Sequence, residues 1–438
     1  MSRPLAVISL CAGLGKRTKV SMPKVLLPLC GRPLAVSALA ATRALAPDRT
    51  VVVVHHQAER VQKVLTAHAA VTGPLEFVDQ GQPRGTGHAV QVAMQALGDF
   101  EGDVLVVYGD VPLINTETLA ALRDAREDAP CAALTAFFED PTGMGRILRD
   151  DEGNFVGIRE QRDCSPEETA IDEINAGFYC FDSELLRPAL GRLSPDNAQG
   201  ELYLTDVIAD FVAAGHEVPT LEIADPSEIQ GVNSLADLAM ARVIMQERIL
   251  FEHLANGVLI VDPATTWIDH DVQIGADTKI LPCTVIGTGC RIGAGCEVGP
   301  FAHLRVGTVL EDGAEIGNFV EAKKTVMGKG AKAKHLTYLG DATIGAKANI
   351  GAGTITANYD GTHKHPTTIG ERCFVGSGTV LVAPTTMADG AMTGAGAITK
   401  RGSALGPDEV WVGVPARLLR KRDAAAGKVD AAKPKEHS

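Results

Sequence analysis

The sequence is poor in aromatic residues and has no long hydrophobic segment. Phe, Trp and Tyr make up 4% of its 438 residues, and it contains no run of about 20 apolar residues, the length that spans a bilayer. The only apolar stretch near its start, residues 5–10, is shorter than the core of a signal peptide. These absences exclude a membrane-spanning helix and predict a cytoplasmic protein without a membrane partner.

An excess of positive charge is also missing. Lys and Arg number 41 against 54 Asp and Glu, so the formal net charge is −13. We therefore expect no nucleic-acid partner, because such binding needs a basic surface. A small phosphorylated ligand needs only local positive charge and stays open. The nine cysteines form no disulfide framework, which indicates reduced thiols in a cytosol-like compartment.

The first half of the chain alternates short apolar runs with segments of helical length. Strands are expected at 5–10, 50–56, 75–79, 103–110, 132–138 and 176–182. Continuous β-branched runs separated by helices predict a mainly parallel sheet covered on both faces, as in Rossmann-like α/β folds. Ligands of such sheets bind beyond the carboxyl ends of the strands.

The second half has a different period. Apolar–Gly pairs recur between 274–275 and 375–376 at spacings of six or a multiple of six. This period predicts a parallel β-helix of hexapeptide repeats, in which each apolar residue points inward. The period is interrupted at 317–345 and 351–370, where we expect loops that leave the coil and carry function.

A long helix is expected at 234–257, with Asn233 or Ser234 as N-cap and Gly257 as its stop. The chain is thus divided into an α/β domain at 1–232, a helical linker at 233–257, a β-helix domain at 258–403 and a largely disordered tail at 404–438.

The first apolar run is followed by a loop with glycine and basic residues, "LCAGLGKR" at 10–17. The backbone of Gly13 and Gly15 can approach a ligand, and its N–H groups can bind phosphate oxygens. Lys24 adds positive charge shortly afterwards. An ordinary strand–helix turn with solvated basic side chains is the other interpretation, and the loop alone does not decide between them.

A second glycine-containing loop, "QGQPRGTGHA" at 80–89, opens a helix, and "VYGD" places Asp110 directly after an apolar strand. A carboxylate there is a natural Mg²⁺ ligand, since Mg²⁺ prefers a few protein oxygens together with phosphates and water. Alternatively, Asp110 caps a helix or a turn. Together, the two loops and the carboxylate favour metal-assisted chemistry on a nucleoside triphosphate.

The second half contains a basic stretch in an otherwise acidic chain. Five lysines and His335 lie between Glu321 and Asp341 without an acidic residue. A solvated basic loop is one interpretation. The other is a site for a phosphorylated ligand, where neutral His335 takes a proton from an amine that attacks a thioester.

Two pairs of potential metal ligands have simpler explanations. Cys290 and Cys296 are six residues apart, which suits small residues stacked inside a coil, and no histidine follows at zinc-site spacing. His363 and His365 form an H-x-H pair without an evident third ligand, so we expect a solvated loop.

Several motifs of the first half, "LCAGLGKR…PKVL", "QGQPRGTGHA", "YGD", "GMGRI", "EINAGFYCFD", "NAQGELYLTD" and "GVNSLADL", resemble those of sugar-1-phosphate nucleotidyltransferases. With the hexapeptide half, "HLTYLGD" and "NIGAGTITANYDG", the chain is similar to a bacterial family with two activities, N-acetylglucosamine-1-phosphate uridyltransferase and glucosamine-1-phosphate N-acetyltransferase. The resemblance covers nearly the whole chain except the tail and implies a left-handed β-helix, homotrimers, and synthesis of UDP-N-acetylglucosamine from UTP, acetyl-CoA and glucosamine-1-phosphate.

The resemblance implies roles for residues at matching positions of the first half. Asp110 and Asn233 would hold Mg²⁺, and Lys24 would bind phosphate. The residues that would contact the nucleotide or the sugar are Leu10, Cys11, Ala12, Gly13, Gln80, Gly85, Thr86, Gly145, Glu160, Asn175 and Asn233.

In the second half, the resemblance makes His335 the general base on the amino group of glucosamine-1-phosphate. The residues that would bind this substrate are Arg305, Lys323, Tyr338 and Asn349. Those that would lie along acetyl-CoA are Ala352, Asn358, Tyr359, Ser377 and Ala395.

The chain departs from the family pattern at two places. Cys11, Lys16 and Thr18 stand where the family loop usually has Ala, Thr and Met, and Cys11 is either a reactive thiol or a small apolar filler. Gly413 stands where the family often has an arginine for the coenzyme phosphates; Arg417 or Arg420 would have to replace it.

Two other functions remain open on the sequence. One is a nucleotidyltransferase with a single activity and a structural β-helix, as in some guanylyl- and adenylyltransferases. The other is a non-catalytic regulatory protein of the same architecture. "HLTYLGD" and "NYDG" disfavour the first, and the joint presence of Lys24, Asp110 and Asn233 disfavours the second.

Overall fold

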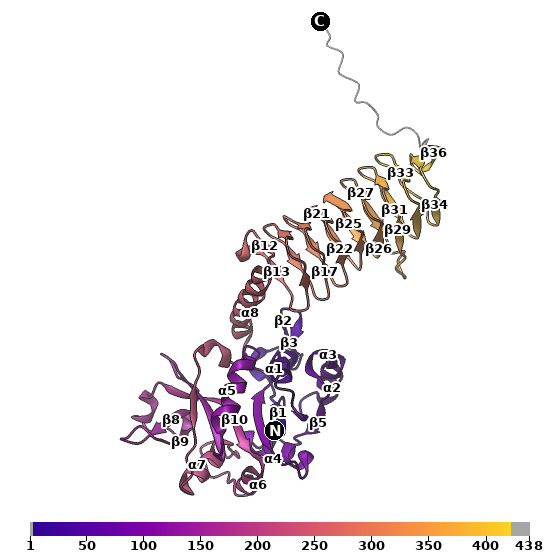
Figure 1. The fold of residues 1–438 in the computed structure, drawn as a ribbon. Coiled ribbons are helices and arrows are strands. Elements are labelled where there is room, and N and C mark those ends of the chain that lie inside the picture. Colours follow the sequence, from indigo (N-terminus) through magenta and orange to yellow (C-terminus); the bar gives the residue numbers. More distant parts are fainter. Residues whose placement is uncertain (1–2, 422–438) are drawn as a thin grey trace. The chain divides into compact units, whose positions relative to one another are not determined.

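The structure is a computed structural model that describes residues 3–421. The chain forms two compact units, Met1–Met245 and Gln246–Ser438. The first contains a mixed sheet with helices on both faces, and the second contains parallel strands stacked coil upon coil (Figure 1). In the part of the chain that the structure describes, no helix combines the length and hydropathy that a bilayer crossing requires.

The sheet of the first unit has the strand order β11-β7-β10-β6-β1-β4-β5. Its strands are β1 (Leu5–Leu10), β4 (Arg49–Val54), β5 (Glu76–Asp79), β6 (Asp103–Tyr108), β7 (Cys131–Phe137), β10 (Glu173–Asp182) and β11 (Thr220–Glu222). Each strand expected from the sequence is present, with ends shifted by a few residues. Strands β1, β4, β5 and β6 are parallel, whereas β10 runs antiparallel to β6 and β7.

Two antiparallel hairpins accompany this sheet. Strands β8 (Arg146–Arg149) and β9 (Phe155–Arg159) pair with each other, and β8 joins the sheet next to β10. The second hairpin consists of β2 (Pro28–Leu29) and β3 (Arg32–Pro33). Neither was expected from the sequence, because their runs are short and mixed in polarity.

Helices bury alternate residues of the central strands. On one face, Ile8 and Val106 pack with residues of α4 (Thr86–Leu97), α6 (Ser183–Leu190) and α7 (Thr205–Ala213). On the other, Val7 and Val107 pack with α5 (Thr116–Arg126), and Val52 packs with α1 (Leu34–Arg43) and α2 (Ala58–Ala67). The short helix α3 (Ala69–Thr72) follows α2. Side chains alternate across a strand, so both faces are apolar and both are covered, as predicted.

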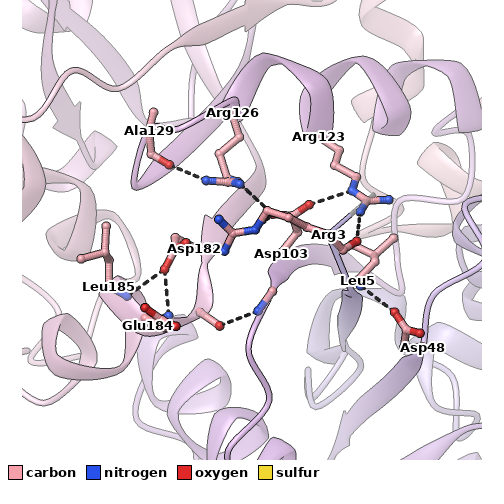
Figure 2. A network of polar contacts seen from close by, with 12 residues as sticks. Arg3, Leu5, Asp48, Asp103, Arg123, Arg126, Ala129, Asp182, Glu184 and Leu185 are labelled. Atoms are coloured by element: carbon pink, nitrogen blue, oxygen red, sulfur yellow. Dashed lines mark hydrogen bonds and ion pairs between the residues drawn. The ribbon is translucent and has the colours of Figure 1, made fainter. Parts of the chain in front are cut away.

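An ion network, buried except for Arg3, lies at the end of the sheet where β1 and β6 begin (Figure 2). The Asp103 carboxylate pairs with Arg3 at 3.4 Å and with Arg123 and Arg126 at 2.8 Å. Asp182 accepts from Arg3 at 2.6 Å and caps α6 through the backbone N–H groups of residues 184 and 185. Burial disfavours charged Asp182, but these donors outweigh it and lower its pKa.

Helix α8 extends over Leu235–Ala255, inside the segment predicted to be helical. Ser234 is its N-cap, since the Ser234 hydroxyl accepts from the backbone N–H of Asp237 at 3.2 Å. The Asp237 carboxylate in turn accepts from the backbone N–H groups of Asn233 and Ser234, both at 2.8 Å. This reciprocal cap fixes the backbone that carries Asn233.

The second unit is built from three sheets that wrap around one apolar interior, and their strands are parallel except for β36, the last strand of the first sheet (Figure 1). The first sheet contains β12 (Leu259–Ile260), β15 (Lys279–Ile280), β18 (Glu297–Val298), β21 (Glu315–Asn318), β24 (Lys332–His335), β27 (Asn349–Ile350), β30 (Phe374–Val375), β33 (Met392–Thr393), β35 (Glu409–Val412) and β36 (Arg417–Lys421). The second contains β13 (Trp267–Ile268), β16 (Val285–Ile286), β19 (His303–Leu304), β22 (Glu321–Lys323), β25 (Tyr338–Gly340), β28 (Ile355–Ala357) and β31 (Val380–Val382). The third contains β14 (Gln273–Ile274), β17 (Arg291–Ile292), β20 (Val309–Leu310), β23 (Val326–Met327), β26 (Ala342–Ile344), β29 (Thr367–Ile369), β32 (Thr385–Met387) and β34 (Ser403–Leu405).

The predicted loop at the first interruption of the repeat, 317–345, is wrong. Strands β22 to β26 continue the coil through it. Leu310 and Met327 are partners 17 positions apart, whereas Ile292 and Leu310 are 18 apart. One missing residue per turn takes the apolar–Gly pairs out of multiples of six without ending the inward stacking. His335 therefore lies on a strand of the regular coil and not on a protruding loop.

The second interruption does contain a loop. Ile350 and Val375 are partners 25 positions apart, and residues 358–366 leave the coil between β28 and β29. Cys290 and Cys296 lie inside the coil, 0% and 2% exposed, as the packing interpretation predicts. The segment expected to form a tail is ordered over 404–421, where β35 and β36 form an antiparallel hairpin. The rest of that tail, 422–438, lies outside the described residues.

Candidate active sites

A cavity of about 250 Å³ lies at the carboxyl ends of β1 and β6 in the first unit. It is lined by residues predicted from the two loops and from the "YGD" motif, namely Leu10, Ala12, Gly13, Lys24, Gln80, Gly85, Thr86 and Asp110. Leu14, Val25, Pro83, Ala89, Tyr108 and Glu201 complete its lining. The fold thus brings together segments that are up to about 190 residues apart, at the sheet edge where ligands of parallel sheets bind.

The first loop approaches this cavity with its backbone. A Cβ at Gly13 would meet no atom within 4 Å, so this glycine leaves open space beside the loop. Gly15 has φ +59°, and a Cβ there would lie 3.0 Å from Cβ of Lys24. Glycine at 15 therefore serves a left-handed turn and lets Lys24 lie directly against the loop.

Lys24 lies between two oxygen ligands. Its ammonium group donates to Oδ1 of Asn233 at 3.0 Å and forms a close ion pair with Oδ2 of Asp110. The three residues come from the 3₁₀ turn Lys24–Leu26, from the end of β6 and from the segment before α8. The two oxygens that the resemblance assigns to a metal thus share one cation-binding point, and their chemistry suits Mg²⁺.

Cys11 is a buried filler in this structure. It is 3% exposed, its thiol lies 3.6 Å from the Ser9 hydroxyl, and burial raises its pKa to about 12. A Cβ at Gly109 would lie 2.4 Å from its sulfur, so the thiol fills the space beside that glycine. Of the two interpretations of Cys11, packing is the one that the geometry supports.

The second loop is held in place by the "NAQGELYLTD" segment. A Cβ at Gly85 would lie 2.5 Å from the carbonyl oxygen of Leu202, so only glycine fits there. The Thr86 hydroxyl accepts from the backbone N–H of Leu204 at 3.2 Å, and the Gln80 amide donates to the carbonyl of Gly85 at 3.1 Å. These contacts orient Gln80, Gly85 and Thr86 toward one cavity.

Gly145, Glu160 and Asn175 lie close together near β8 and β10. The Asn175 N–H donates to the carbonyl of Gly145 at 2.9 Å, and the Asn175 side chain exchanges hydrogen bonds with the Tyr179 hydroxyl. A Cβ at Gly145 would lie 3.5 Å from the carbonyl oxygen of the residue before Glu160. Burial raises the pKa of Glu160, and the nearby acids at 163, 206 and 201 raise it further.

Tyr108 links this group to the cavity and was missed in the sequence analysis. It lines the cavity, its ring lies 3.0 Å from the position of a Cβ at Gly177, and burial raises its pKa, with further contributions from Glu160 and Asp110. Its place in "VYGD", two residues before Asp110, is the signal that could have revealed it.

In the second unit, His335 belongs to a column of residues at one corner of the coil. The carbonyl of His335 accepts from the N–H of Gly353 at 3.4 Å, that of Ala352 from Gly378 at 2.7 Å, and that of Ser377 from Gly396 at 2.8 Å. The predicted base therefore shares a corner with three residues predicted to lie along acetyl-CoA: Ala352, Ser377 and Ala395.

The side chains at this corner change at His335. Phe301, Phe319 and Leu336 have positive φ of 53°, 54° and 49°, although they are not glycines. In the following coils the corner residue is Gly353, then Gly378 and Gly396, with φ of 73°, 71° and 70°. The positive-φ position of the corner therefore carries a large exposed apolar side chain as far as Leu336 and no side chain from Gly353 onward, which leaves an open path along the coil.

A group of cations lies on the second sheet of the coil. Lys323 contacts Lys364, and this neighbour lowers the pKa of Lys323, with a further contribution from Arg305. Arg305 also pairs with Glu321 at 2.7 Å. Two ammonium groups in contact repel each other, so the arrangement suits an anion that lies between them. Lys364 was missed because the "NYDG" loop folds back over the coil, which no local pattern reveals.

The remaining predicted residues are divided between two sheets. Tyr338 and Asn358 meet above Gly340, where a Cβ would lie 2.5 Å from the Tyr338 hydroxyl and 2.6 Å from Nδ2 of Asn358. Asn349, by contrast, lies in the first sheet. It pairs there with Lys332, on the strand that also carries His335. The structure thus gathers Arg305, Lys323, Tyr338 and Asn358 on the second sheet and leaves Asn349 on another.

The 358–366 loop is pinned at its base by Asp360. Its carboxylate accepts from His365 at 2.6 Å and pairs with Arg401 at 3.4 Å, while Tyr359 forms a bridge with Lys364. His363 is exposed. Of the expected H-x-H pair, His365 is held by an acid and an arginine, and His363 is solvated.

Gly413 lies in the turn between β35 and β36, with φ +90°. Arg417 and Arg420 stand on β36 opposite Val412 and Val410, and both are exposed. Val412 approaches the coil corner, since its Cγ1 lies 2.8 Å from the position of a Cβ at Gly394. Of the two arginines, Arg417 is therefore the one whose strand partner, Val412, adjoins the coil next to Ala395.

Family models match both halves of the chain. Residues 7–203 match a MobA-like NTP transferase domain, 265–300 match the bacterial transferase hexapeptide, and 283–318 and 366–399 match the hexapeptide repeat of succinyl-transferase. A nucleotide-binding α/β domain followed by a hexapeptide β-helix with a basic, histidine-containing edge defines a two-domain transferase.

Curated relatives match over both halves. The chain is 43% identical to "Bifunctional protein GlmU" of Corynebacterium diphtheriae, over 91% of this chain and 90% of that protein. Proteins of the same name from Trichlorobacter lovleyi and from Synechococcus sp. are 44% and 43% identical, over 89% and 87% of this chain and 92% and 90% of theirs. The chain belongs to the family of bifunctional GlmU proteins.

Proposed function

We propose that this protein makes UDP-N-acetylglucosamine in two steps, as its family is expected to do. The second unit transfers an acetyl group from acetyl-CoA to glucosamine-1-phosphate, and the first transfers a uridyl group from UTP to the product. The observation that carries this proposal is the contact of Lys24 with both Asp110 and Asn233 at the cavity that Lys24 and Asp110 line, together with His335 at the start of an open corner in the other unit.

In the uridyl step, a phosphate oxygen of N-acetylglucosamine-1-phosphate attacks the α-phosphorus of UTP. A new P–O bond forms as the P–O bond to pyrophosphate breaks, and the reaction needs charge neutralisation and in-line positioning. The backbone from Leu10 to Gly13, including Cys11, lies along the nucleotide, and Lys24 neutralises a phosphate. Gln80, Gly85 and Thr86 contact the uracil, and Gly145, Glu160 and Asn175 contact the sugar.

Asp110 and Asn233 are proposed to hold Mg²⁺. A carboxylate and an amide oxygen are suitable ligands, and Lys24 already binds at the point where they meet. The structure describes no group of three or more His, Cys, Asp or Glu side chains suited to a metal within 3–421, so phosphate and water would supply the other ligands. Bound there, Mg²⁺ would neutralise charge on the phosphates.

In the acetyl step, the amine of glucosamine-1-phosphate attacks the thioester carbonyl of acetyl-CoA. The C–N bond forms as His335 takes the proton from the amine, and the C–S bond breaks as that proton passes to the departing sulfur, which leaves as the coenzyme thiol. His335 is exposed, so its imidazole is accessible to a substrate. Arg305, Lys323, Tyr338, Asn349 and Lys364 are proposed to bind the sugar phosphate.

Acetyl-CoA is proposed to lie along the open corner, beside Ala352, Ser377 and Ala395. The glycines at 353, 378 and 396 put no side chain there, so a slender pantetheine chain has room. Asn358 and Tyr359, in the loop that follows β28, are proposed to contact acetyl-CoA as well. Arg417 is proposed to meet the coenzyme phosphates in place of the arginine that Gly413 replaces.

We further propose that the protein is a cytoplasmic homotrimer. Phe301 and Phe319 stack at 5.1 Å between ring centroids, yet they are 50% and 57% exposed, and Leu336 is 63% exposed. Non-glycine residues at positive φ cost energy, which a buried contact in an assembly would offset. Asn349 and the Lys323 group lie on different sheets, so a neighbouring copy would complete the substrate site.

The first experiment is an incubation of the full chain with glucosamine-1-phosphate, acetyl-CoA, UTP and Mg²⁺, in which free thiol and pyrophosphate are followed separately. We expect both products, with pyrophosphate dependent on Mg²⁺. Pyrophosphate with N-acetylglucosamine-1-phosphate but no thiol release would leave a single-activity nucleotidyltransferase. Neither product would point to a non-catalytic homologue.

A further inference from the structure

The ammonium group of Lys24 occupies the place where a cation would contact both Asp110 and Asn233. It donates to Oδ1 of Asn233 at 3.0 Å and forms an ion pair with Oδ2 of Asp110. The side chains of Lys24 and Asp110 are 10% and 21% exposed, so this contact is largely shielded from water. One internal cation thus contacts both oxygens.

We infer that the ammonium group of Lys24 occupies the binding site of the divalent cation on Asp110 and Asn233. The metal then enters this site only when a phosphate draws the ammonium group away. This inference rests on the proposed assignment of the site to nucleotide and metal. A metal ion on the same two oxygens would bring three positive charges within a few Å of one carboxylate, and this repulsion disfavours joint binding of the lysine and the metal.

The phosphate has a route to Lys24 within the same cavity. Lys24, Gly13 and Asp110 all line it, so a phosphate that lies against the glycine loop is near the ammonium. The base of Lys24 cannot shift, since its Cβ abuts Gly15 and its carbonyl accepts from the N–H of Leu27 at 3.0 Å. Only the flexible end of the side chain is left to move.

The consequence is a thermodynamic link between metal and nucleotide. In the free protein, the metal must displace the ammonium group of Lys24, and no other anion is there to pair with it. The affinity of the protein for the metal is therefore low. Once a phosphate pairs with Lys24, Asp110 and Asn233 are free for the metal, and its affinity rises. Linkage is reciprocal, so the metal raises nucleotide affinity by the same factor.

The test is Mn²⁺ binding to the full chain without nucleotide, followed by the electron paramagnetic resonance signal of free Mn²⁺. We expect Lys24→Met to bind Mn²⁺ at least about 10-fold more tightly than the parent protein. Lys24→Arg, which keeps a cation, is the matched control and should bind as weakly as the parent. Asp110→Asn added to Lys24→Met should remove the gain.

A second readout is the melting temperature, since an ion that binds only the folded state raises it. Mn²⁺ should raise the melting temperature of Lys24→Met and of Lys24→Gln, but not that of the parent. These two variants also show whether loss of Lys24 leaves the protein folded.

Two outcomes would overturn the inference. Mn²⁺ binding to the parent as tight as to Lys24→Met would mean that the ammonium excludes nothing. Equally weak binding to both, with both folded, would mean that something other than Lys24 limits the metal. Failure of the proposed function looks different: the parent would then release no pyrophosphate from UTP, N-acetylglucosamine-1-phosphate and Mg²⁺, whatever the behaviour of Lys24→Met.

Discussion

At the scale of the single residue, His335 is an exposed histidine at the corner of a regular coil, and replacing it tests its role directly. The coil holds its backbone through the N–H of Gly353, while its side chain stays accessible. Replacing an exposed imidazole should change the stability of the fold little, so the replacement tests chemistry rather than folding.

We predict that His335→Asn lowers acetyl transfer by at least about 100-fold, the contribution typical of a general base. Uridyl transfer should stay within about 2-fold, because its cavity lies in the other compact unit. Separate thiol and pyrophosphate assays on the same preparation measure both. An equal loss of the two activities would contradict two independent sites.

Lys364 provides a second test at this scale. Lys364→Met removes the charge that lowers the pKa of Lys323 and should return that pKa toward its ordinary value. With one ammonium fewer for the phosphate, we expect KM for glucosamine-1-phosphate to rise about 10-fold and kcat to change little. Lys347→Met, an exposed lysine elsewhere on the coil, is the control. A fall in kcat at unchanged KM would argue against a phosphate contact.

Sequence motifs predicted many of the residues that line the cavity, but only part of the cation group in the second unit. Lys24, Asp110 and Gln80 belong to short motifs, and strand ends bring such motifs together in any parallel sheet. Lys364 reaches Lys323 through a loop that folds back, and Tyr108 reaches the region of Glu160 across the sheet. Contacts of that kind depend on where other segments lie, so the local sequence does not contain them.

At the scale of the element, a side chain added at the corner of the β-helix tests the path proposed for acetyl-CoA. Gly396 and Gly313 both have positive φ, +70° and +67°, and a Cβ at either would meet nothing within 4 Å. They differ in position: Gly396 follows Ala395 on the open corner, and Gly313 lies on another turn of the coil.

We predict that Gly396→Leu raises KM for acetyl-CoA about 10-fold, whereas Gly313→Leu changes it less than about 2-fold. Both variants bear the same cost of a left-handed non-glycine residue, roughly 1–2 kcal/mol. Their melting temperatures should therefore fall together. If both variants raise KM equally, strain and not a blocked path is the cause.

The ion network of Figure 2 joins several elements of the first unit. Asp103 pairs with three arginines, and Arg126 is only 2% exposed. Loss of the carboxylate would leave a buried guanidinium without its partner. We predict that Asp103→Asn lowers the free energy of unfolding of the first unit by about 3 kcal/mol.

The control for this prediction is Glu76→Gln, which breaks the exposed pair with Arg49 in the same unit. Exposed pairs contribute at most about 1 kcal/mol, so its effect should be small. Chemical denaturation followed by circular dichroism measures both. Similar losses would mean that burial does not set the strength of the Asp103 network.

At the scale of the whole molecule, the exposed apolar corner is the surface through which we propose that the protein assembles. Phe319 is 57% exposed and stacks on Phe301 at the edge that also carries His335. We predict that Phe319→Glu yields monomers and lowers acetyl transfer at least about 10-fold. Uridyl transfer should stay within about 2-fold.

Light scattering coupled to size exclusion gives the oligomeric state, and Val156→Glu is the control, since Val156 is 41% exposed on β9 of the first unit. A Phe319→Glu protein that keeps both its assembly and its acetyl transfer would show that the corner is not an interface.

The two halves differed in how far their architecture could be predicted. Each predicted strand of the α/β sheet is present because continuous β-branched runs between helices allow few other structures. The antiparallel direction of β10 is not written in its own residues, since a buried strand has the same apolar run in either direction. In the β-helix, one residue fewer per turn hid the coil between 317 and 345 from a period of six.

Local patterns were enough for the presence of both domains, the two loops of the first site and the basic stretch of the second, because each depends on backbone preferences and spacing within a short segment. Folding decided the rest. Lys24, Asp110 and Asn233 meet only because strand order and the cap of α8 bring three distant segments to one point. The corner column from His335 to Ala395 exists because coils stack, and stacking joins residues that no pattern in a single coil connects.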